Sequence, residues 1–393
     1  MTADELHCVC FGAGGLGLGF LGPELAPECR ITYVDVPEKA PFLDQLRRRG
    51  EYVLNLTGLS MRPVRVGGVE GVCLGEETRE EVLAALAEAD LVFTAVGAAN
   101  LPALAPAVAA ALSRRSPANP LRVLCGENGV QIARSFRAAV ESEAEGPAGE
   151  ALRVGDTVMG RMCKVVADPQ PPLQPPAPGL DWAVVAEPFY GIPVEQHAVA
   201  GMGTLPAAIE PHSAARFRAC EDVKMLAHNG LHATLACLGY LRGALFFDEL
   251  RADAELMEHA RRLLIDEAGA ALLRRHGAAL GRNRYFNYCD AILRRVTCPV
   301  LHDSVERGVR GIMRKLEPWE RLVYSVRTVA EAGVEPRAFA TGLAAAVTVA
   351  RRTGETEQQF RRVLTEHCGF EPEEDAALID LIEGCRAAMV QEL

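Results

Sequence analysis

The chain has 393 residues, of which 49% are hydrophobic and 24% are charged, as expected of an ordinary globular enzyme with two or three domains. Its formal net charge of −11 argues against nucleic acid as a general partner, although a local basic pocket for an anionic substrate stays open. No stretch reaches about 18 uninterrupted apolar residues, and no leader pattern is present, so we expect neither a membrane span nor a signal peptide.

The first half of the chain alternates short apolar runs with helical stretches, which predicts a parallel sheet covered by helices. The expected strands are His7–Phe11, Arg30–Val36, Leu91–Val96, Leu121–Cys125 and Trp182–Glu187. A helix is expected at Glu77–Glu88. The proline-rich segment 167–179 excludes a helix or a central strand, so we interpret it as an exposed loop between two strands.

The pattern becomes helical from about Ala200 onward. The expected helices are Glu221–Gly243, Asp253–His276, Arg284–Arg295, Glu317–Ala332, Pro336–Arg352 and Glu355–His367. We therefore predict an α/β fold: a Rossmann-type, doubly wound, NAD-binding domain in residues 1–200, followed by a mostly α-helical substrate and catalytic domain in residues 201–393. This organisation predicts an active site in a cleft between the two domains.

The 12 cysteines are scattered, and none forms a C-x-x-C pair, which gives no support to a zinc ribbon or a thioredoxin-type redox site. Their apolar neighbours predict buried thiols in a reducing environment. We therefore expect a cytoplasmic protein.

A glycine-rich turn follows the first expected strand. The segment His7–Phe20 reads HCVCFGAGGLGLGF and contains G-x-G-x-x-G at Gly12, Gly14 and Gly17. In a strand–turn–helix unit, the first glycine permits the tight turn, the second lets the backbone approach a pyrophosphate, and the third lets the helix pack on the strand. The following helix N-terminus then offers N–H groups to the phosphates.

The second strand reaches Asp35, 23 residues after Gly12. An acidic side chain there binds ribose hydroxyls and repels a 2′-phosphate, which favours NAD over NADP. The alternative is an ordinary turn residue. Three further residues follow strand ends, where ligands of open α/β sheets bind, and they are either cofactor contacts or ordinary turn residues. They are Val96, Glu127 and Asn128.

The segment Lys224–His232, KMLAHNGLH, concentrates reactive side chains in an expected helix. At about 100° per residue, Lys224, Asn229 and His232 lie near 0°, 140° and 80° around the axis, on one half of its surface. An amine, an amide and an imidazole together can remove a proton from an alcohol and hold the resulting oxyanion. With the glycine signature, they predict an alcohol dehydrogenase that needs no metal.

Each of these residues also has a structural alternative. Lys224 can be a solvated helix lysine, Asn229 a surface amide, and His232 a core histidine. His228 adds a two-histidine i, i+4 face, but no third ligand is evident, so we expect no metal.

Several segments resemble the polyol-specific long-chain dehydrogenases, in particular the shorter branch typified by mannitol-1-phosphate 5-dehydrogenase. The resemblance is carried by GAGGLGLGFLG at Gly12–Gly22, TAVG from Thr94, the Glu127-Asn128 pair, E-P-F at Glu187–Phe189, the K-x-x-x-x-N-x-x-H spacing of Lys224, Asn229 and His232, and the stretch Leu301–Val323. It implies that Lys224 is the general base, with Asn229 and His232 as donors to the developing oxyanion. A lysine has a reference pKa of about 10.4, so burial or nearby cations must lower it for this role.

The resemblance also implies substrate contacts in a basic cluster, which is otherwise a solvated helix end. Arg307 and Lys315 match the motif, and Arg310 lies between them, although Gly311 and Ile312 replace the D-P that follows in the family. Relatives tend to show V-D-R-I-V-P where this chain has VMGRMC, so Gly160 stands near the place of an active-site Asp.

The leading hypothesis is therefore an NAD-dependent interconversion of mannitol 1-phosphate and fructose 6-phosphate. The departures keep open the same chemistry on another polyol or on a hexuronate. A third hypothesis is a dinucleotide-binding relative without turnover. The expected partner is a small polyol or sugar phosphate, with no nucleic acid and no membrane, and the expected state is a monomer or a small homo-oligomer.

Overall fold

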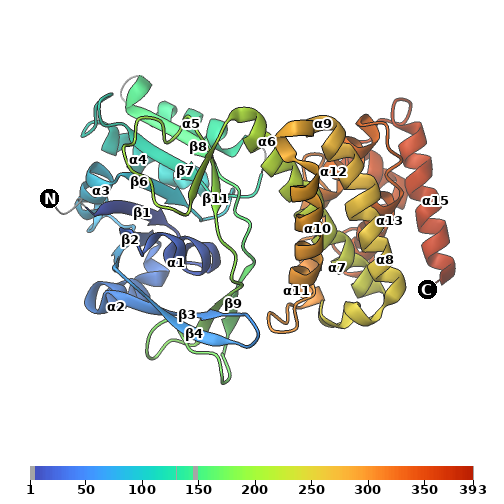
Figure 1. Cartoon of the computed structure of the whole chain (residues 1–393), viewed down its shortest axis with the longest axis horizontal. Coiled ribbons are helices and arrows are strands. Elements are labelled where there is room, and N and C mark those ends of the chain that lie inside the picture. Colours follow the sequence, from blue (N-terminus) through green and yellow to red (C-terminus); the bar gives the residue numbers. More distant parts are fainter. Residues whose placement is uncertain (1–4, 130, 145–148, 393) are drawn as a thin grey trace. The chain divides into compact units, whose positions relative to one another are not determined.

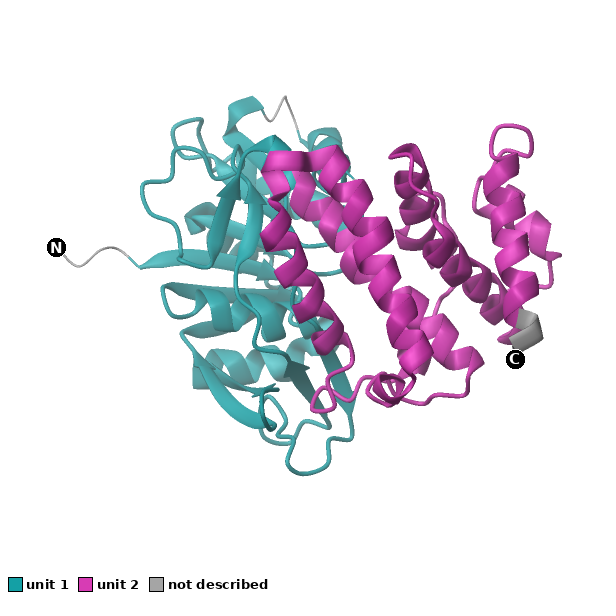
Figure 2. Ribbon diagram, turned by 45° about the vertical axis from the view of Figure 1, so that its right-hand side comes forward, with its two compact units in different colours: residues 1–217 teal, residues 218–393 magenta. Residues whose placement is uncertain are grey.

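The computed structural model describes residues 5–129, 131–144 and 149–392. The chain divides into two compact units, the first ending at Phe217 and the second starting at Arg218 (Figure 2).

The main sheet of the first unit has six strands in the order β5-β2-β1-β6-β7-β8, and every neighbouring pair is parallel. The strands are β1 (Leu6–Phe11), β2 (Cys29–Asp35), β5 (Val69–Cys73), β6 (Leu91–Thr94), β7 (Leu121–Cys125) and β8 (Leu152–Asp156) (Figure 1). The predicted strands at β1, β2, β6 and β7 are confirmed to within two residues. The sheet order reverses between β1 and β6, which is where open α/β sheets bind their ligands.

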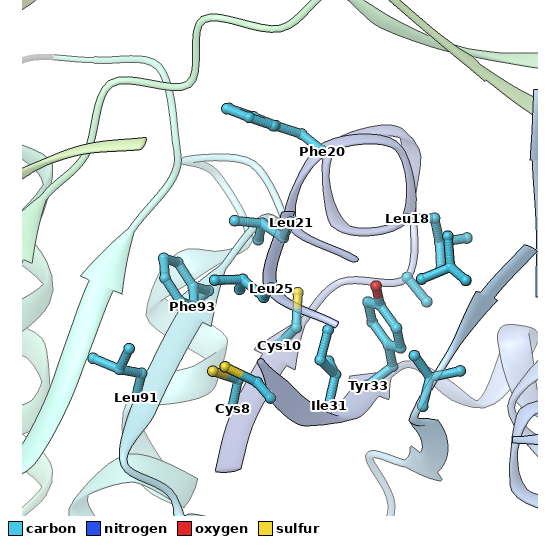
Figure 3. Packing of buried hydrophobic residues seen from close by; sticks show 14 of the residues in the cluster. Cys8, Cys10, Leu18, Phe20, Leu21, Leu25, Ile31, Tyr33, Leu91 and Phe93 are labelled. Carbon is cyan, nitrogen blue, oxygen red and sulfur yellow. The ribbon is translucent and has the colours of Figure 1, made fainter. Parts of the chain in front are cut away.

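Alternate side chains of β1 enter two different cores. Cys8 and Cys10 belong to a cluster with Leu21 and Leu25, whose packing Figure 3 shows. Val9 and Phe11 belong to the cluster on the opposite face. Because both faces are covered, the sheet is doubly wound, as predicted. The helices of this unit are α1 (Gly22–Leu25), α2 (Ala40–Arg49), α3 (Arg79–Glu88), α4 (Ala105–Leu112) and α5 (Ile132–Glu143).

A second, smaller sheet has the order β4-β3-β10-β9. Its strands are β3 (Glu51–Leu56), β4 (Arg62–Gly67), β9 (Cys163–Ala167) and β10 (Trp182–Ala186), and a separate pair is formed by β11 (Ile192–Glu195) and β12 (Ile209–His212). The predicted proline-rich loop joins the antiparallel strands β9 and β10, as expected. Asn55 holds this loop, since its side chain donates to the Gln174 carbonyl (2.8 Å) and accepts from the Gln174 N–H (2.9 Å).

The second unit is built from helices that run largely alongside one another (Figure 2). Its helical segments, with α6 starting just before it, are α6 (Ala214–Val223), α7 (Leu231–Leu241), α8 (Ala254–Arg262), α9 (Ala270–Leu280), α10 (Arg282–Val296), α11 (Val305–Val309), α12 (Arg321–Glu331), α13 (Arg337–Arg352), α14 (Phe360–Arg362) and α15 (Ala376–Glu392). The predicted helical half is confirmed, although the pattern did not indicate α15. Within the described ranges, no helix has both the length and the apolarity to cross a membrane.

Helix α7 is almost wholly buried, and small residues let its neighbours approach it closely. A Cβ atom on Gly342 of α13 would lie 2.3 Å from the Thr234 hydroxyl oxygen of α7. A Cβ atom on Gly308 of α11 would lie 2.7 Å from the Ala236 side chain of α7. These close approaches hold α7, which carries His232, firmly within the unit.

Candidate active site

The glycine loop after β1 has the conformation that the sequence pattern predicts. Gly12 has φ +104°, and a Cβ atom there would lie 2.6 Å from the Ala95 carbonyl oxygen. Gly17 is closer still to its neighbour, since its Cβ would lie 1.9 Å from the Gly12 carbonyl oxygen. Both positions therefore require glycine, one for the turn and one for the packing of the helix on the strand.

Gly14 has the opposite surroundings, because a Cβ atom there would meet no atom within 4 Å. The backbone at Gly14 thus faces open space at the start of a helix, where Leu18 donates its N–H to the Gly14 carbonyl (2.9 Å). Exposed backbone N–H groups at a helix N-terminus suit a pyrophosphate. These three glycines fit a dinucleotide.

Asp35, at the end of β2, contacts the same loop. Its Oδ2 accepts the Ala13 N–H (2.7 Å), and its Oδ1 accepts the Val36 N–H (2.7 Å). The carboxylate therefore fixes the loop to the strand end. Each carboxylate oxygen has a second lone pair, so the same side chain can also accept a ribose hydroxyl.

Glu127 is buried between two strand ends. It accepts the Thr94 hydroxyl (2.5 Å) and the Val96 N–H (3.0 Å). Val96 is half-buried and Asn128 is exposed beside it. Glu127 thus ties the end of β7 to the end of β6, at the sheet edge where Val96 and Asn128 also lie.

Sequence reasoning missed Asp156, at the end of β8. Burial raises its pKa to about 6, and it accepts the Ala133 N–H (2.8 Å) at the start of α5. The strand β8 reads LRVGD, in which Arg153 interrupts the apolar pattern, so no clear apolar run marks this position in the sequence.

The region of the VMGRMC departure is organised by Arg161. This buried residue pairs with the buried Glu24 of α1, and it donates to the Gly19 carbonyl (2.9 Å) and the Phe189 carbonyl (2.8 Å). A Cβ atom on Gly160 would lie 2.7 Å from the Phe189 ring. The ring therefore fills the space that a larger side chain at residue 160 needs, which explains why glycine stands there.

In the second unit, the predicted catalytic segment is a π-helical turn rather than a regular α-helix. The segment η5 (Lys224–Gly230) joins α6 to α7 without a break, so Lys224, Asn229 and His232 lie on one continuous helix. Hydrogen bonds in a π turn span five residues instead of four, so the angular step is smaller than the 100° assumed from the sequence. Such wide turns frequently occur at functional sites. Gly230 ends the turn, where a Cβ would lie 2.9 Å from the Phe339 ring.

His232 contacts a buried carboxylate that sequence reasoning did not assign. Its Nε2 lies 3.6 Å from Asp303 Oδ2, and Asp303 also receives a two-pronged ion pair from Arg307, including a 2.6 Å contact from Nε. Burial favours a raised pKa for Asp303, but the nearby His232 ring and the hydrogen bonds and charge of Arg307 lower it well below its ordinary value. Asp303 is therefore ionised.

Two of the predicted basic residues differ in their surroundings. Lys315 is buried, and its Nζ donates to the Gly308 carbonyl (2.5 Å). Burial, together with the charges of Arg321 and Arg314, lowers the pKa of Lys315 to about 8. Arg310 is exposed and lines a surface hollow with Tyr240 and Glu355.

His228 is 7% exposed, and its Nδ1 has no hydrogen-bond partner among the described residues. Burial, and then the charges of Arg295 and Lys224, lower the pKa of His228 well below its ordinary value. The His228 ring is therefore neutral, and the charge of Lys224 contributes to its lowered pKa. Over the described part of the chain, no three His, Cys, Asp or Glu side chains gather as a metal site would require.

Comparison with known proteins identifies both parts of the chain. Residues 6–205 match the family model described as mannitol dehydrogenase Rossmann domain, and residues 217–367 match the mannitol dehydrogenase C-terminal domain. A mannitol-1-phosphate 5-dehydrogenase of Shouchella clausii (strain KSM-K16) is 30% identical over 372 residues, which cover 93% of this chain and 94% of that protein. The enzyme of the same name from Geobacillus thermodenitrificans (strain NG80-2) is 34% identical over 321 residues, covering 81% and 80%.

Solved structures share the fold at low sequence identity. A Pseudomonas fluorescens mannitol 2-dehydrogenase, solved as a ternary complex with NAD and D-mannitol, superposes with a TM-score of 0.73 at 16% identity, covering 99% of this chain and 92% of that chain. A D-sorbitol dehydrogenase gives the same TM-score and identity, covering 99% and 94%. From the two domain matches and the full-length relatives, the chain belongs to the mannitol dehydrogenase family.

Proposed function

We propose that this protein is an NAD-dependent polyol dehydrogenase that interconverts mannitol 1-phosphate and fructose 6-phosphate without a metal ion. The observation that carries the proposal is the placement of Lys224, Asn229 and His232 on one continuous helix, with the ionised Asp303 beside His232. The glycine loop and the names of the full-length relatives support the same reaction.

The first unit holds the cofactor. Gly12, Gly14 and Gly17 shape the loop that receives the pyrophosphate, and Asp35 accepts the adenosine ribose hydroxyls. The negative charge of Asp35 disfavours a 2′-phosphate, which selects NAD over NADP. Bound NAD supplies the acceptor for the substrate hydride.

Val96 and Asn128 contribute to the cofactor site at the ends of β6 and β7, and Glu127 holds these strand ends together. The hydrogen bonds that Glu127 accepts from Thr94 and Val96 connect the ends of β6 and β7, so the strand ends keep a fixed spacing. A rigid edge of this kind holds a cofactor in one orientation.

The helical unit carries the proton chemistry. Lys224 removes the hydroxyl proton during alcohol oxidation and returns it during ketone reduction. Asn229, 9% exposed, presents a side-chain amide that donates a hydrogen bond to the developing oxyanion. His232 contacts the same substrate oxygen or its neighbour. A positioned general base of this type contributes a factor of about 10² to 10⁴.

A basic group, made of Arg307, Arg310 and Lys315, binds the anionic part of the substrate. Lys315 is a buried ammonium and Arg307 a half-exposed guanidinium, while the exposed Arg310 adds positive charge nearby. The alternative, another polyol or a hexuronate, has its own support: Phe189 fills the space beside Gly160, and Arg307 is already engaged by Asp303.

The remaining proposals concern organisation. We assign residues 1–200 to the NAD-binding domain and residues 201–393 to the helical substrate domain. The enzyme works in the cytoplasm as a monomer or small homo-oligomer, and its 12 cysteines, all of them thiols, suit a reducing compartment.

A substrate panel tests the proposal. NADH oxidation is followed at neutral pH with fructose 6-phosphate, other ketose phosphates, free ketoses and keto-uronates. We expect the highest kcat/KM with fructose 6-phosphate. If only unphosphorylated substrates react, the phosphate role of the basic group is wrong. If NADH binds and no substrate is reduced, the dehydrogenase proposal is wrong and a dinucleotide-binding relative without turnover remains.

A further inference from the structure

Asp303 is a carboxylate, 2% exposed, that two different functional side chains share. Arg307 pairs with both of its oxygens from one side, at i, i+4 across the start of α11. His232 approaches from α7, with Nε2 at 3.6 Å from Oδ2. A carboxylate is costly to remove from water, so its burial needs these partners. The same three residues therefore form one electrostatic unit.

We propose that Asp303 is a positioning residue for the reaction: it engages Nε2 of His232 and fixes the Arg307 guanidinium, which leaves Nδ1 as the His232 nitrogen that meets a substrate oxygen. This inference rests on the proposed function, because it assigns a role to His232 in that reaction. The contact of 3.6 Å is longer than a hydrogen bond, and such contacts often tighten when the substrate is bound.

The choice of nitrogen has a chemical consequence. A neutral imidazole carries one proton, and an Nε2–H directed at Asp303 leaves a lone pair on Nδ1. Nδ1 then accepts a hydrogen bond from a substrate hydroxyl. Only the protonated ring donates from Nδ1, so His232 acts as an oxyanion donor in its charged form. The Asp303 carboxylate stabilises that charged form, as the buried aspartate of a catalytic triad stabilises its imidazolium.

The charges around His232 make this carboxylate decisive. Arg307 and Lys315 both disfavour a protonated His232, and burial does so more strongly than either of them. A charge on His232 also lowers the pKa of His228. Asp303 opposes these effects and raises the pKa of His232, although the net direction stays below the ordinary value.

The His232 ring also packs against an aromatic ring. Its centroid lies 4.4 Å from that of Phe247, with the two planes inclined by 31°. Phe247 also donates its backbone N–H to the Asp303 carbonyl (2.9 Å). Asp303 thus acts on the His232 ring through its carboxylate and on Phe247 through its backbone. The substitution Asp303→Asn removes only the carboxylate.

The test is the pH dependence of ketose reduction by Asp303→Asn. We expect kcat to fall about 10- to 100-fold, the range found when the carboxylate partner of a metal-bound histidine is lost. We also expect the pH at which activity is lost on the alkaline side to move down by roughly one unit or more, because a nearby opposite charge has been removed. A merely structural role lowers kcat without moving that pH. An unchanged pH profile overturns the proposal.

Asp248→Asn is the matched control. Asp248 contacts His302 in the same unit, with Oδ1 at 3.0 Å from Nδ1, and neither residue belongs to the proposed site. We expect wild-type kcat and an unmoved profile. Equal shifts in both variants contradict a specific role for Asp303.

A second measurement needs no folded variant of Asp303. Nitrogen-15 NMR of the histidine rings, with His232→Gln used to assign the resonance, reports which nitrogen carries the proton in the neutral ring. The proposal predicts Nε2–H, and Nδ1–H overturns it. If Lys224→Ala is inactive while Asp303→Asn keeps the wild-type profile, only this inference fails. If the wild type reduces no sugar, the proposed function fails, and the NMR result still decides which nitrogen Asp303 engages.

Discussion

Glu267 provides a buried charge whose effect on stability can be worked out from the structure. It lies in a wide helical turn, Leu263–Gly269, and is 6% exposed. Its Oε1 accepts the Ala338 N–H (2.5 Å) and its Oε2 accepts the Phe339 N–H (3.0 Å), so it caps the N-terminus of α13.

Burial raises the pKa of Glu267 from its ordinary value of 4.5 to about 7, although the two backbone hydrogen bonds oppose the change. The folded protein therefore binds this proton more tightly than the unfolded chain does. The contribution to stability is full below pH 4.5 and is lost as the pH rises through 7. Between pH 5 and pH 8, the loss amounts to about 2 to 3 kcal/mol.

Glu267→Gln removes this dependence. The glutamine oxygen still accepts one N–H, but its NH₂ group faces the other, which costs about 1 to 3 kcal/mol. The free energies of unfolding of the variant and the wild type are measured by urea unfolding, followed by circular dichroism, at each pH. Only the difference between the two proteins at one pH is used, because the two units need not unfold together. We expect the variant to be less stable at pH 5 and to gain about 2 to 3 kcal/mol relative to the wild type by pH 8. The exposed Glu331→Gln is the control. Parallel curves for Glu267→Gln and the wild type would show that the Glu267 carboxyl does not carry this pH dependence.

Two further predictions concern the ligand sites. Gly14→Ala should fold normally, since its Cβ meets nothing within 4 Å. It should nevertheless weaken NADH binding, measured by fluorescence titration, because the methyl group occupies the side that the pyrophosphate approaches. Unchanged affinity would show that Gly14 is not part of the cofactor site. Because burial lowers the pKa of Lys315 to about 8, its ammonium loses its charge as the pH rises through that value. The KM for fructose 6-phosphate should therefore increase in the wild type when the pH exceeds 8. In Lys315→Met, the KM should not change with pH. Equal pH dependence in the two proteins would exclude a phosphate contact.

Elements with strong local patterns could be predicted from the sequence. The strands β1, β2, β6 and β7 are mostly apolar and almost wholly buried, as expected of strands covered on both faces. The strand β4 could not be found in this way, because its residues are mostly exposed and it belongs to a small sheet held by pairing with β3. Its place depends on tertiary pairing rather than on local sequence.

The candidate site shows the same division. Spacing alone places Lys224, Asn229 and His232 on one helix, but it does not reveal the wide turn, which keeps the helix continuous while changing its angular step. Asp303 lies 71 positions from His232, and only the folded unit brings its carboxylate to the imidazole. Arg161 and Glu24 are even farther apart in the sequence, by 137 positions.

The central claim is that Lys224 is the proton-transferring group of a polyol dehydrogenase. Its most direct test is fructose 6-phosphate reduction by Lys224→Ala, measured beside NADH binding and beside Lys39→Ala, a lysine that stacks on Trp182 outside the proposed site. We expect Lys224→Ala to turn over about 10² to 10⁴ times more slowly, with unchanged affinity for NADH, while Lys39→Ala matches the wild type. Wild-type turnover by Lys224→Ala would contradict the central claim.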